Sequence, residues 1–269
     1  MKKLLKIIPI LLLTIFFLQS CDKDDDTIIP PATNNIVDIA QSSEDFTSLV
    51  AALQKADLVT TLQTEGPFTV LAPTNEAFST FLSDNGFGSL DEVPTDVLTK
   101  VLLNHVISGT VASTDLSTGY TNTLATSSAS NSPMSLFVDT SSGVRFNGIS
   151  SVTTANISAD NGIVHVVDAV IGLPTIATFA TSNNALSNLV DALAYADTGN
   201  PTVPYISTVS DATTGPFTVF APTNDAFADL LTELNATALT DLPTSAVNDV
   251  LLYHIVGANV QSGQLTTGT

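Results

Sequence analysis

Basic residues are scarce in this chain of 269 residues, which has 7 Lys and Arg against 26 Asp and Glu. The segment 1–20 contains three of the lysines and no acidic residue, so the remainder has four basic and 26 acidic residues, a net charge of −22. Binding to nucleic acid requires clusters of Lys and Arg that neutralise phosphates. Attraction to an anionic membrane surface requires them as well. The charge balance therefore argues against nucleic acid as a partner and against electrostatic binding to membranes.

Histidine and cysteine are also rare, with three histidines and one cysteine. A zinc site has three or four protein ligands, and His105 with His165 would provide only two. The sequence has no Gly-x-Ser-x-Gly motif of a serine hydrolase. Glycosidases use a pair of catalytic carboxylates, but such a pair cannot be identified in a sequence with so many acidic residues. We therefore expect no catalytic residue, no metal site and no cofactor, and we expect that the protein is not an enzyme.

The segment 1–20 has the pattern of a secretory signal. Three lysines precede an apolar run that extends to Leu18, and Ser20 is a small residue before the cleavage point. The run is interrupted by Pro9 and is short for a transmembrane helix, although an uncleaved membrane anchor is the alternative. Cys21 follows and, as the only cysteine, cannot form an intramolecular disulfide. Its position resembles the lipobox of bacterial lipoproteins, which implies that the Cys21 thiol is lipidated and anchors the protein to a membrane.

Residues 21–34 predict a tether. They include an acidic run at 22–26 that stays solvated, because like charges repel one another. A calcium loop is the alternative for this run, but the spacing and the distal Glu of an EF-hand are missing. The run also resembles the acidic segment that directs some Gram-negative lipoproteins to the outer face of the cell. The sequence thus predicts export to the bacterial outer membrane and exposure at the cell surface, with the periplasmic face as the alternative.

The strongest pattern in the sequence is a long internal repeat. Residues 66–78 return almost unchanged as residues 215–227, and residues 102–107 return as 251–256. The offset is the same for both pairs, since 215 − 66 and 251 − 102 both equal 149. Arrays of small repeats have periods of about 20–50 residues, so this spacing indicates two copies of a whole domain.

The repeated box at residues 66–78 predicts a strand that turns sharply into a helix. Its Gly-Pro pair favours a turn, the residues after it favour a β-strand, and the second proline prevents further pairing because it has no N–H. Thr74 or Asn75 can cap the helix that follows, as can Thr223 or Asn224 in the second copy. We therefore expect these four residues to be structural.

Outside the box, helical patterns precede strand patterns. Residues 46–53 and 97–102 place apolar side chains at helical spacing, whereas residues 113–132 have no clear periodicity. The strands expected after them are residues 134–138, 144–146, 155–159 and 163–171. Asn-Gly at 161–162 is typical of a hairpin turn. Early helices and late strands predict an α+β fold.

Three segments resemble, in the right order, the signatures of the fasciclin domain family. They are the Gly-Pro-Phe-Thr-Val-x-Ala-Pro-Thr-Asn-acid-Ala-Phe box, the Leu-Leu-x-His segment and residues 161–171. Within the third, His165 shares a strand face with Ile163 and Val167, and we expect it to be structural. The resemblance extends from about residue 35 to the end of the sequence. It implies a β-sandwich-like wedge with packed helices, in two tandem copies.

The repeat and the resemblance divide the chain. The expected parts are a signal peptide at 1–20, the tether at 21–34, a first fasciclin-like domain at 35–173 and a second at 174–269. The second copy has an insertion between positions 195 and 211, where we expect a surface loop. No counterpart of residues 119–173 follows the second copy. We therefore expect the second domain to be incomplete and the sequence to be part of a longer chain.

The repeated histidines are the candidate interaction residues. His105 and His254 stand at the end of a predicted helix among apolar residues, where a partly buried imidazole bonded to the backbone is the structural explanation. In animal fasciclin-domain adhesion proteins the corresponding Tyr-His region is implicated in integrin binding. Tyr253 and His254 match that region, whereas the first copy has Asn104 before His105. An exported bacterial protein has no obvious integrin partner, so we do not transfer that activity.

The sequence thus predicts a lipid-anchored protein of the cell envelope or surface that acts in cell adhesion or in contact with extracellular matrix or biofilm. The expected partner is an extracellular protein or polysaccharide, and the oligomeric state is left open. Two similar weak sites on one tether would raise the effective affinity. The alternative is a periplasmic or surface binding protein for a small molecule or polysaccharide, which would need an apolar groove between the helices and the wedge.

Overall fold

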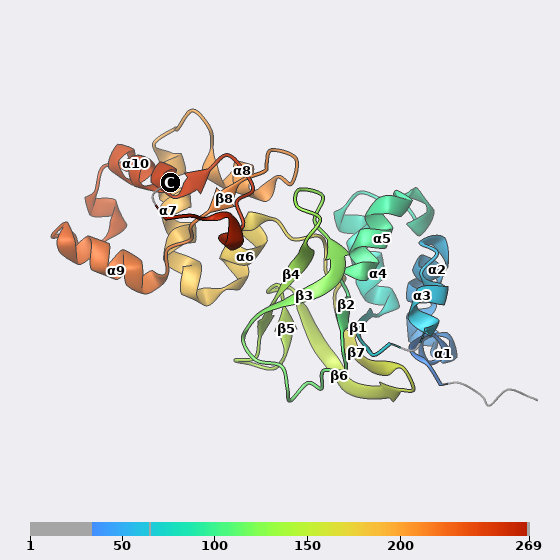
Figure 1. Ribbon diagram of the computed structural model, residues 1–269. Coiled ribbons are helices and arrows are strands. Elements are labelled where there is room, and N and C mark those ends of the chain that lie inside the picture. Colours follow the sequence, from blue (N-terminus) through green and yellow to red (C-terminus); the bar gives the residue numbers. More distant parts are fainter. Residues whose placement is uncertain (1–33, 65, 268–269) are drawn as a thin grey trace, which may run out of the picture. The chain divides into compact units, whose positions relative to one another are not determined.

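The computed structural model describes residues 34–64 and 66–267 (Figure 1). The expected signal peptide, Cys21 and the tether up to residue 33 lie outside these residues. Two groups of elements follow one another along the described chain, a first copy of the repeat that ends with a strand at Val167 and a second copy that begins with a helix at Ile176.

Two of the five helices of the first copy begin at side chains that cap them, whereas the other three have no side-chain cap from the residue that precedes them. They are α1 (Ile36–Ser42), α2 (Thr47–Lys55), α3 (Val59–Gln63), α4 (Asn75–Asp84) and α5 (Thr95–Leu103), with short 3-10 helices η1 (Glu44–Phe46) and η2 (Leu90–Glu92). Before α1, the Asn35 side chain accepts hydrogen bonds from the N–H groups of Val37 and Asp38. Before α4, the Thr74 hydroxyl accepts one from Ala77 N–H. These bonds satisfy N–H groups that have no partner within the helix.

The strands of the first copy form one mixed sheet in the order β2-β1-β7-β6-β5-β4-β3. The strands are β1 (Phe68–Pro73), β2 (Val106–Ser108), β3 (Gly119–Thr126), β4 (Pro133–Asp139), β5 (Arg145–Phe146), β6 (Ser150–Ala159) and β7 (Gly162–Val167). β1 pairs antiparallel with β2 on one side and parallel with β7 on the other, where Phe68 lies opposite Gly162 and Pro73 opposite Val167. β2 and β3, which stand at opposite ends of the strand order, also contact each other. The sheet is therefore curled.

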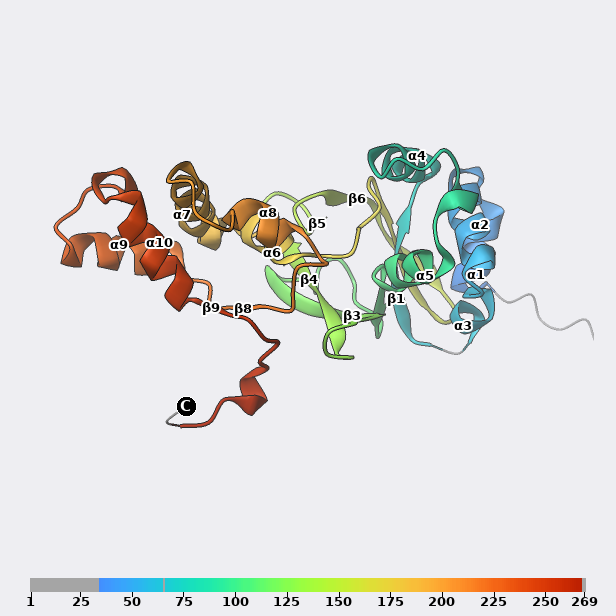
Figure 2. The same cartoon turned by 90° about the horizontal axis from the view of Figure 1, so that it is seen from above.

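Two apolar cores hold the first copy together. The larger lies between the helices and strands β1 and β7, and Figures 1 and 2 show the five helices gathered on one side of these strands. It contains, among others, Phe46, Leu49, Phe78, Leu98 and Val164. The smaller core lies among the strands and consists of Leu71, Ile107, Leu136, Val138, Phe146, Val167 and Ile171. Burial of such side chains, at roughly 1.5–3 kcal/mol each, is the main stabilising contribution.

The second copy repeats the helices with a much smaller strand part. Its elements are α6 (Ile176–Ser182), η3 (Asn184–Leu186), α7 (Ser187–Thr198), α8 (Tyr205–Ser210), β8 (Thr218–Val219), α9 (Asn224–Glu233), η4 (Leu239–Asp241), α10 (Thr244–Tyr253), β9 (Ile255–Val256) and η5 (Ser262–Gln264). β8 and β9 pair antiparallel, as β1 and β2 do. The inserted residues are divided between an extension of α7 and the connection at 199–204, so they form more than the surface loop that was expected.

The α+β class expected from the sequence is confirmed. The strands expected at 134–138 and 144–146 are present as β4 and β5. β3 was not predicted, because its sequence, Gly-Tyr-Thr-Asn-Thr-Leu-Ala-Thr, has few large apolar residues and shows no clear apolar–polar alternation. Its pairing with β4 is also irregular between Asn122 and Thr126. Helices α1 and α3 were not predicted either, because they have only 7 and 5 residues and therefore show little periodicity.

The closing hairpin differs from the prediction in two details. Ala159 pairs with Gly162, so residues 160 and 161 form the turn and Gly162 already belongs to β7. β7 ends at Val167 rather than at residue 171, because Asp168 turns back to exchange hydrogen bonds with Ser151.

Candidate functional site

The asparagine of the repeated box connects two helices. Thr74 caps α4, but Asn75 extends to the start of α2, where its Oδ1 accepts hydrogen bonds from Ser48 N–H at 2.8 Å and from the Thr47 hydroxyl at 3.1 Å. Its Nδ2 donates to the Glu44 carbonyl at 2.8 Å. α2 has no cap from its own flanking residue, so Asn75 supplies one from a distant part of the chain.

The same arrangement occurs in the second copy. Thr223 caps α9 through a hydrogen bond from Ala226 N–H. Asn224 accepts a hydrogen bond from Asn188 N–H at 2.9 Å, near the start of α7, and donates to the Asn184 carbonyl at 2.9 Å. The box therefore specifies both the strand-to-helix corner and the position of the preceding helix.

A threonine inside each box holds the loop after the second strand of its copy. Thr69 is fully buried; its hydroxyl donates to the Gly109 carbonyl at 2.7 Å and accepts from Val111 N–H at 2.9 Å. In the second copy the Thr218 hydroxyl donates to the Ala258 carbonyl at 2.7 Å and accepts from Val260 N–H at 2.8 Å. Both loops therefore have the same local geometry.

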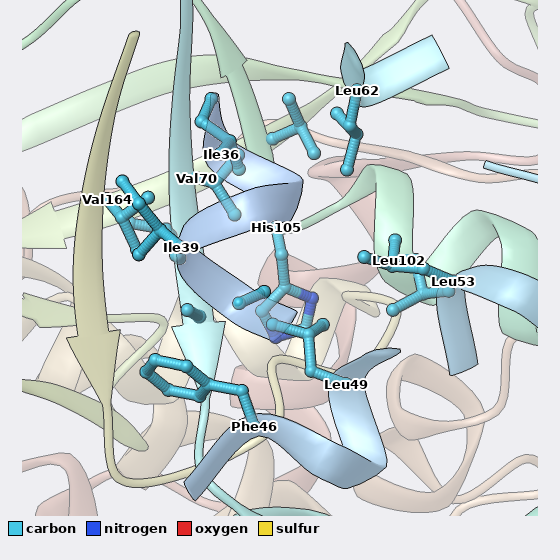
Figure 3. Close-up of a pocket in the computed structure, with 14 residues that line it drawn as sticks. Ile36, Ile39, Phe46, Leu49, Leu53, Leu62, Val70, Leu102, His105 and Val164 are labelled. Atoms are coloured by element: carbon cyan, nitrogen blue, oxygen red, sulfur yellow. The ribbon is translucent and has the colours of Figure 1, made fainter. Parts of the chain in front are cut away.

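His105 lies in the apolar core of the first copy, with Leu49, Leu53 and Leu102 around its ring (Figure 3). Its Nε2 accepts a hydrogen bond from Ile171 N–H at 2.8 Å, so the proton is on Nδ1, which donates to the Val101 carbonyl at 2.8 Å. Burial lowers the pKa of His105 from 6.5 to about 4, against the opposing effect of the Val101 carbonyl. The imidazole is therefore neutral at pH 7, with both nitrogens bonded to the backbone.

The candidate interaction residues have very different exposures in the two copies. Asn104 is fully buried; its side chain donates to the Gly172 carbonyl at 3.0 Å and accepts from the Thr123 hydroxyl at 3.1 Å. Tyr253, at the equivalent position, is 90% exposed. His254 is partly exposed and donates from Nδ1 to the Val250 carbonyl at 2.8 Å, as His105 does to Val101. Of the four candidates, only Tyr253 and His254 are accessible to a partner.

His165 is fully buried on β7 and serves the structure. Its Nδ1 accepts a hydrogen bond from Asn156 N–H at 3.1 Å, so Nε2 carries the proton and donates to the Val111 carbonyl at 3.0 Å. His105 and His165 thus have opposite tautomers, and both rings are bonded entirely to backbone groups. This arrangement does not present a base or a metal ligand to solvent.

Two structurally important residues were not singled out from the sequence. Asn161 was interpreted only as part of a turn, but its Oδ1 accepts from Ile36 N–H at 2.9 Å and its Nδ2 donates to the carbonyls of Leu62 and Thr64 at 2.7 and 2.8 Å. Lys55 donates from Nζ to three carbonyls of the η2 region, each at 2.8 Å. Nothing local in the sequence indicates these contacts, because their partners lie in distant parts of the sequence.

Exposed large apolar side chains are concentrated in the second copy. Nine of the eleven among the described residues lie there, and they are Val203, Ile206, Phe220, Leu234, Val250, Leu252, Tyr253, Val256 and Leu265. No Lys or Arg follows Arg145 in the sequence, so this copy has only acidic charges. Phe220 N–H donates to the His254 carbonyl at 2.9 Å, which places Phe220 beside the end of α10.

Residues 34–64 and 66–267 contain neither a cluster of metal ligands nor a helix that could span a membrane. No group of three or more His, Cys, Asp or Glu side chains there could hold a metal ion. No helix in this part of the chain is both long and apolar enough to span a membrane.

Comparison with known families decides the identity of the repeat. Residues 44–174 and 184–269 each match the Fasciclin domain. The chain belongs to the fasciclin family. Its two matched segments contain the box, the repeated histidine and, in the first copy, the closing strand β7 described above, so the resemblance seen in the sequence is confirmed.

Relatives of this fasciclin protein occur in bacteria and animals. Protein sll1483 of Synechocystis sp. is 37% identical over 136 residues, which are 51% of this chain and 72% of that protein. Transforming growth factor-beta-induced protein ig-h3 of Oryctolagus cuniculus is 24% identical over 246 residues, 85% of this chain but only 32% of that protein. The chain thus spans about a third of the length of this animal relative.

A solved structure also resembles the fasciclin chain. It is a FAS1 domain pair from the insect cell adhesion molecule fasciclin I, with a TM-score of 0.44 and 18% sequence identity. The match covers 80% of this chain and 71% of that one.

Proposed function

We propose that this fasciclin protein is anchored by a lipid at Cys21 to the bacterial outer membrane and adheres to an extracellular protein or polysaccharide. The observation that carries the proposal is the presence of two fasciclin segments behind a sequence with the pattern of a lipoprotein signal. Two similar domains on one tether favour adhesion, because the second contact forms at a high effective concentration once the first has formed.

The interior of the first copy does not expose its histidines for acid–base catalysis. The groups most suited to acid–base chemistry, His105 and His165, are buried and bonded to backbone atoms through both ring nitrogens. A general base must come within hydrogen-bond distance of the proton that it takes from the substrate. These imidazoles would have to leave their packed positions first.

The surface of the second copy supports contact with a partner. Tyr253, Leu252 and Phe220 are exposed there, and this copy has acidic residues but no Lys or Arg. Exposed tyrosine provides a large contact area and a hydroxyl group with little loss of side-chain entropy on binding.

The alternative, a small-molecule binding protein, has little support from the first copy. The cavity around His105 has a volume of about 20 Å³, enough for about one water molecule. A larger cavity of about 620 Å³ lies in the second copy, lined mainly by residues 199–204 and by side chains of α8 and α10, and it is open to solvent rather than enclosed.

Deleting residues 35–269 while keeping the signal and the tether should abolish adhesion. We expect cells that display only the anchor to attach to extracellular matrix or biofilm polysaccharide about tenfold less than cells with the full chain, because the contacts of both domains are lost together. The cells that remain attached after washing are counted, and an epitope tag is used to match the amount of anchored protein in the two strains. A Cys21→Ala variant, released from the membrane, serves as a second test and should be equally ineffective. Equal attachment by the three strains would contradict the proposal.

A further inference from the structure

The residues inserted in the second copy form one wall of a cavity. In the first copy α2 ends at Lys55, and residues 56–58 connect it to α3. In the second copy α7 continues to Thr198, and the longer connection 199–204 joins it to α8 (Figure 1). This connection lines the cavity of about 620 Å³ together with side chains of α8 and α10. The wall is therefore a feature of the insertion and distinguishes the second copy from the first.

Hydrogen bonds hold this wall in place. The Asp197 carboxylate accepts from Tyr205 N–H at 2.7 Å and from Ile206 N–H at 3.0 Å, which fixes the first turn of α8. The Tyr205 hydroxyl donates to Asn248 Oδ1 at 2.8 Å and thereby connects α8 to α10. Gly199 approaches α10 so closely that a Cβ there would lie 2.5 Å from the hydroxyl oxygen of the first residue of that helix. The wall is thus ordered before a ligand binds, which lowers the entropic cost of binding.

Four polar side chains of the lining are available to a ligand. Among the residues that the structure describes they form no hydrogen bond, and they are Asn200, Thr202, Thr244 and Ser245. An amide or hydroxyl side chain can both donate and accept hydrogen bonds. The cavity therefore offers several donors and acceptors to a ligand that has hydroxyl groups.

Apolar side chains lie between these polar groups along the chain. Pro201, Val203 and Pro204 belong to the same connection and line the same cavity. A sugar ring has hydroxyl groups around its edge and C–H groups on its faces. Its chemistry therefore matches a lining that combines apolar surface with a few polar groups.

The lining does not suit a charged ligand. The described residues that line the cavity include no Asp, Glu, Lys, Arg or His, and no Lys or Arg follows Arg145 in the sequence. A phosphate, sulfate or carboxylate group would lose water there without gaining a cationic partner. A cationic ligand would likewise find no carboxylate in the lining. The charge pattern favours a neutral ligand.

The size and the opening of the cavity favour a segment of a polymer. A volume of about 620 Å³ lies within the range of ligand pockets, which is about 300–1,000 Å³. Because the cavity is open to solvent, a polysaccharide chain can extend beyond the units that are bound.

We propose that this cavity binds a short segment of a neutral polysaccharide. Hydroxyl groups of the sugar units form hydrogen bonds with Asn200, Thr244 and Ser245, and the faces of the rings pack against Pro201 and Val203. The inference rests on the proposed adhesive function, and it specifies polysaccharide rather than protein as the class of partner for the second copy.

Oligosaccharide binding to the full-length protein in detergent tests the proposal. Isothermal titration calorimetry is carried out with the neutral sugars cellotetraose, isomaltotetraose and mannotetraose, and with tetragalacturonic acid as the acidic control of the same length. We expect at least one neutral sugar to bind at millimolar concentration and the acidic sugar to bind at least tenfold more weakly than that one. Failure of all three neutral sugars to bind, or equal binding of the acidic one, would overturn the proposal.

Two tryptophan variants locate the binding. Ser245 and Ala246 are both exposed in the first turn of α10, but only Ser245 lines the cavity. Ser245→Trp should weaken sugar binding at least tenfold because the ring occupies the cavity, whereas Ala246→Trp, the matched control, should change it less than about twofold. Ser245→Ala removes a single hydrogen bond and should weaken binding about threefold. Equal affinities of the two tryptophan variants for the sugar would contradict the assignment.

An apolar ligand and a failure of adhesion give different results. An apolar dye that binds the native protein but not Ser245→Trp, and that no neutral sugar displaces, would overturn the proposal in favour of an apolar ligand. The titrations do not involve cells, so they are independent of the attachment assay. Absence of sugar binding overturns the site but leaves adhesion through other contacts intact, whereas equal attachment with and without residues 35–269 overturns adhesion but leaves the site intact.

Discussion

Replacing Asn161 by alanine should lower the stability of the first copy by about 3–5 kcal/mol, because each buried polar group left without a partner costs about 1–3 kcal/mol. The change removes the partner of one N–H group and of two carbonyls, which belong to Ile36, Leu62 and Thr64. Such a loss is a large fraction of the stability of a typical domain, about 5–15 kcal/mol. Native-state hydrogen exchange of the β1 and β7 amides measures it, because these amides report on the first copy alone.

Asn122→Ala is the matched control for this measurement. Asn122 is exposed on β3, and substitutions at exposed positions usually change stability by less than about 0.5 kcal/mol. Comparable protection of β1 and β7 in the Asn161 and Asn122 variants would show that the Asn161 contacts do not stabilise the fold.

Acidification should destabilise the first copy through His105. Because the pKa of His105 is about 4 in the folded protein and 6.5 ordinarily, the unfolded chain takes up the proton more readily. The stabilising effect of the neutral ring is complete above pH 6.5 and is lost as the pH falls from 6.5 to 4. A pKa difference of this size corresponds to about 3 kcal/mol in the free energy of unfolding. NMR of the imidazole, together with stability measured from about pH 7.5 to 4, checks both values.

A His105→Gln variant separates this effect from that of the carboxylates. Asp139, Asp211 and Asp241 also have lowered pKa values, each chiefly through hydrogen bonds from neighbouring Ser or Thr residues, and they too favour folding less as the pH falls. The variant keeps these carboxylates but has no titrating ring at position 105. Its stability should therefore fall by about 3 kcal/mol less than that of the native protein over this range. The explanation fails if both proteins have the same pH dependence or if His105 titrates near its ordinary pKa.

The part of the fold that could be predicted is the part specified by local sequence. The strand-to-helix corner follows from the order of Gly-Pro, a β-prone run and Thr74, and the internal repeat places the same corner in the second copy. The helices at residues 46–53 and 97–102 were visible because their apolar residues recur at helical spacing. These features require no knowledge of distant contacts.

The features that were missed depend on contacts between distant residues. Asn75 caps a helix that begins far earlier in the chain, and Asn161 is bonded to residues near the start of the described chain. Strand β3 is held by its pairing with β4 rather than by a strong pattern of its own. The sequence could also not show that Asn104 is buried while Tyr253 is exposed, since both follow the same Leu-Leu pair. Tertiary structure decides such differences.

Protease treatment of intact cells tests the central claim, display of the fasciclin domains outside the cell, most directly. Proteinase K is the suitable enzyme, because after residue 34 the chain offers trypsin only Lys55, Lys100 and Arg145. The account predicts that the full-length protein disappears from intact cells while a periplasmic marker stays whole. Survival of the protein until the outer membrane is permeabilised would contradict it and place the domains in the periplasm.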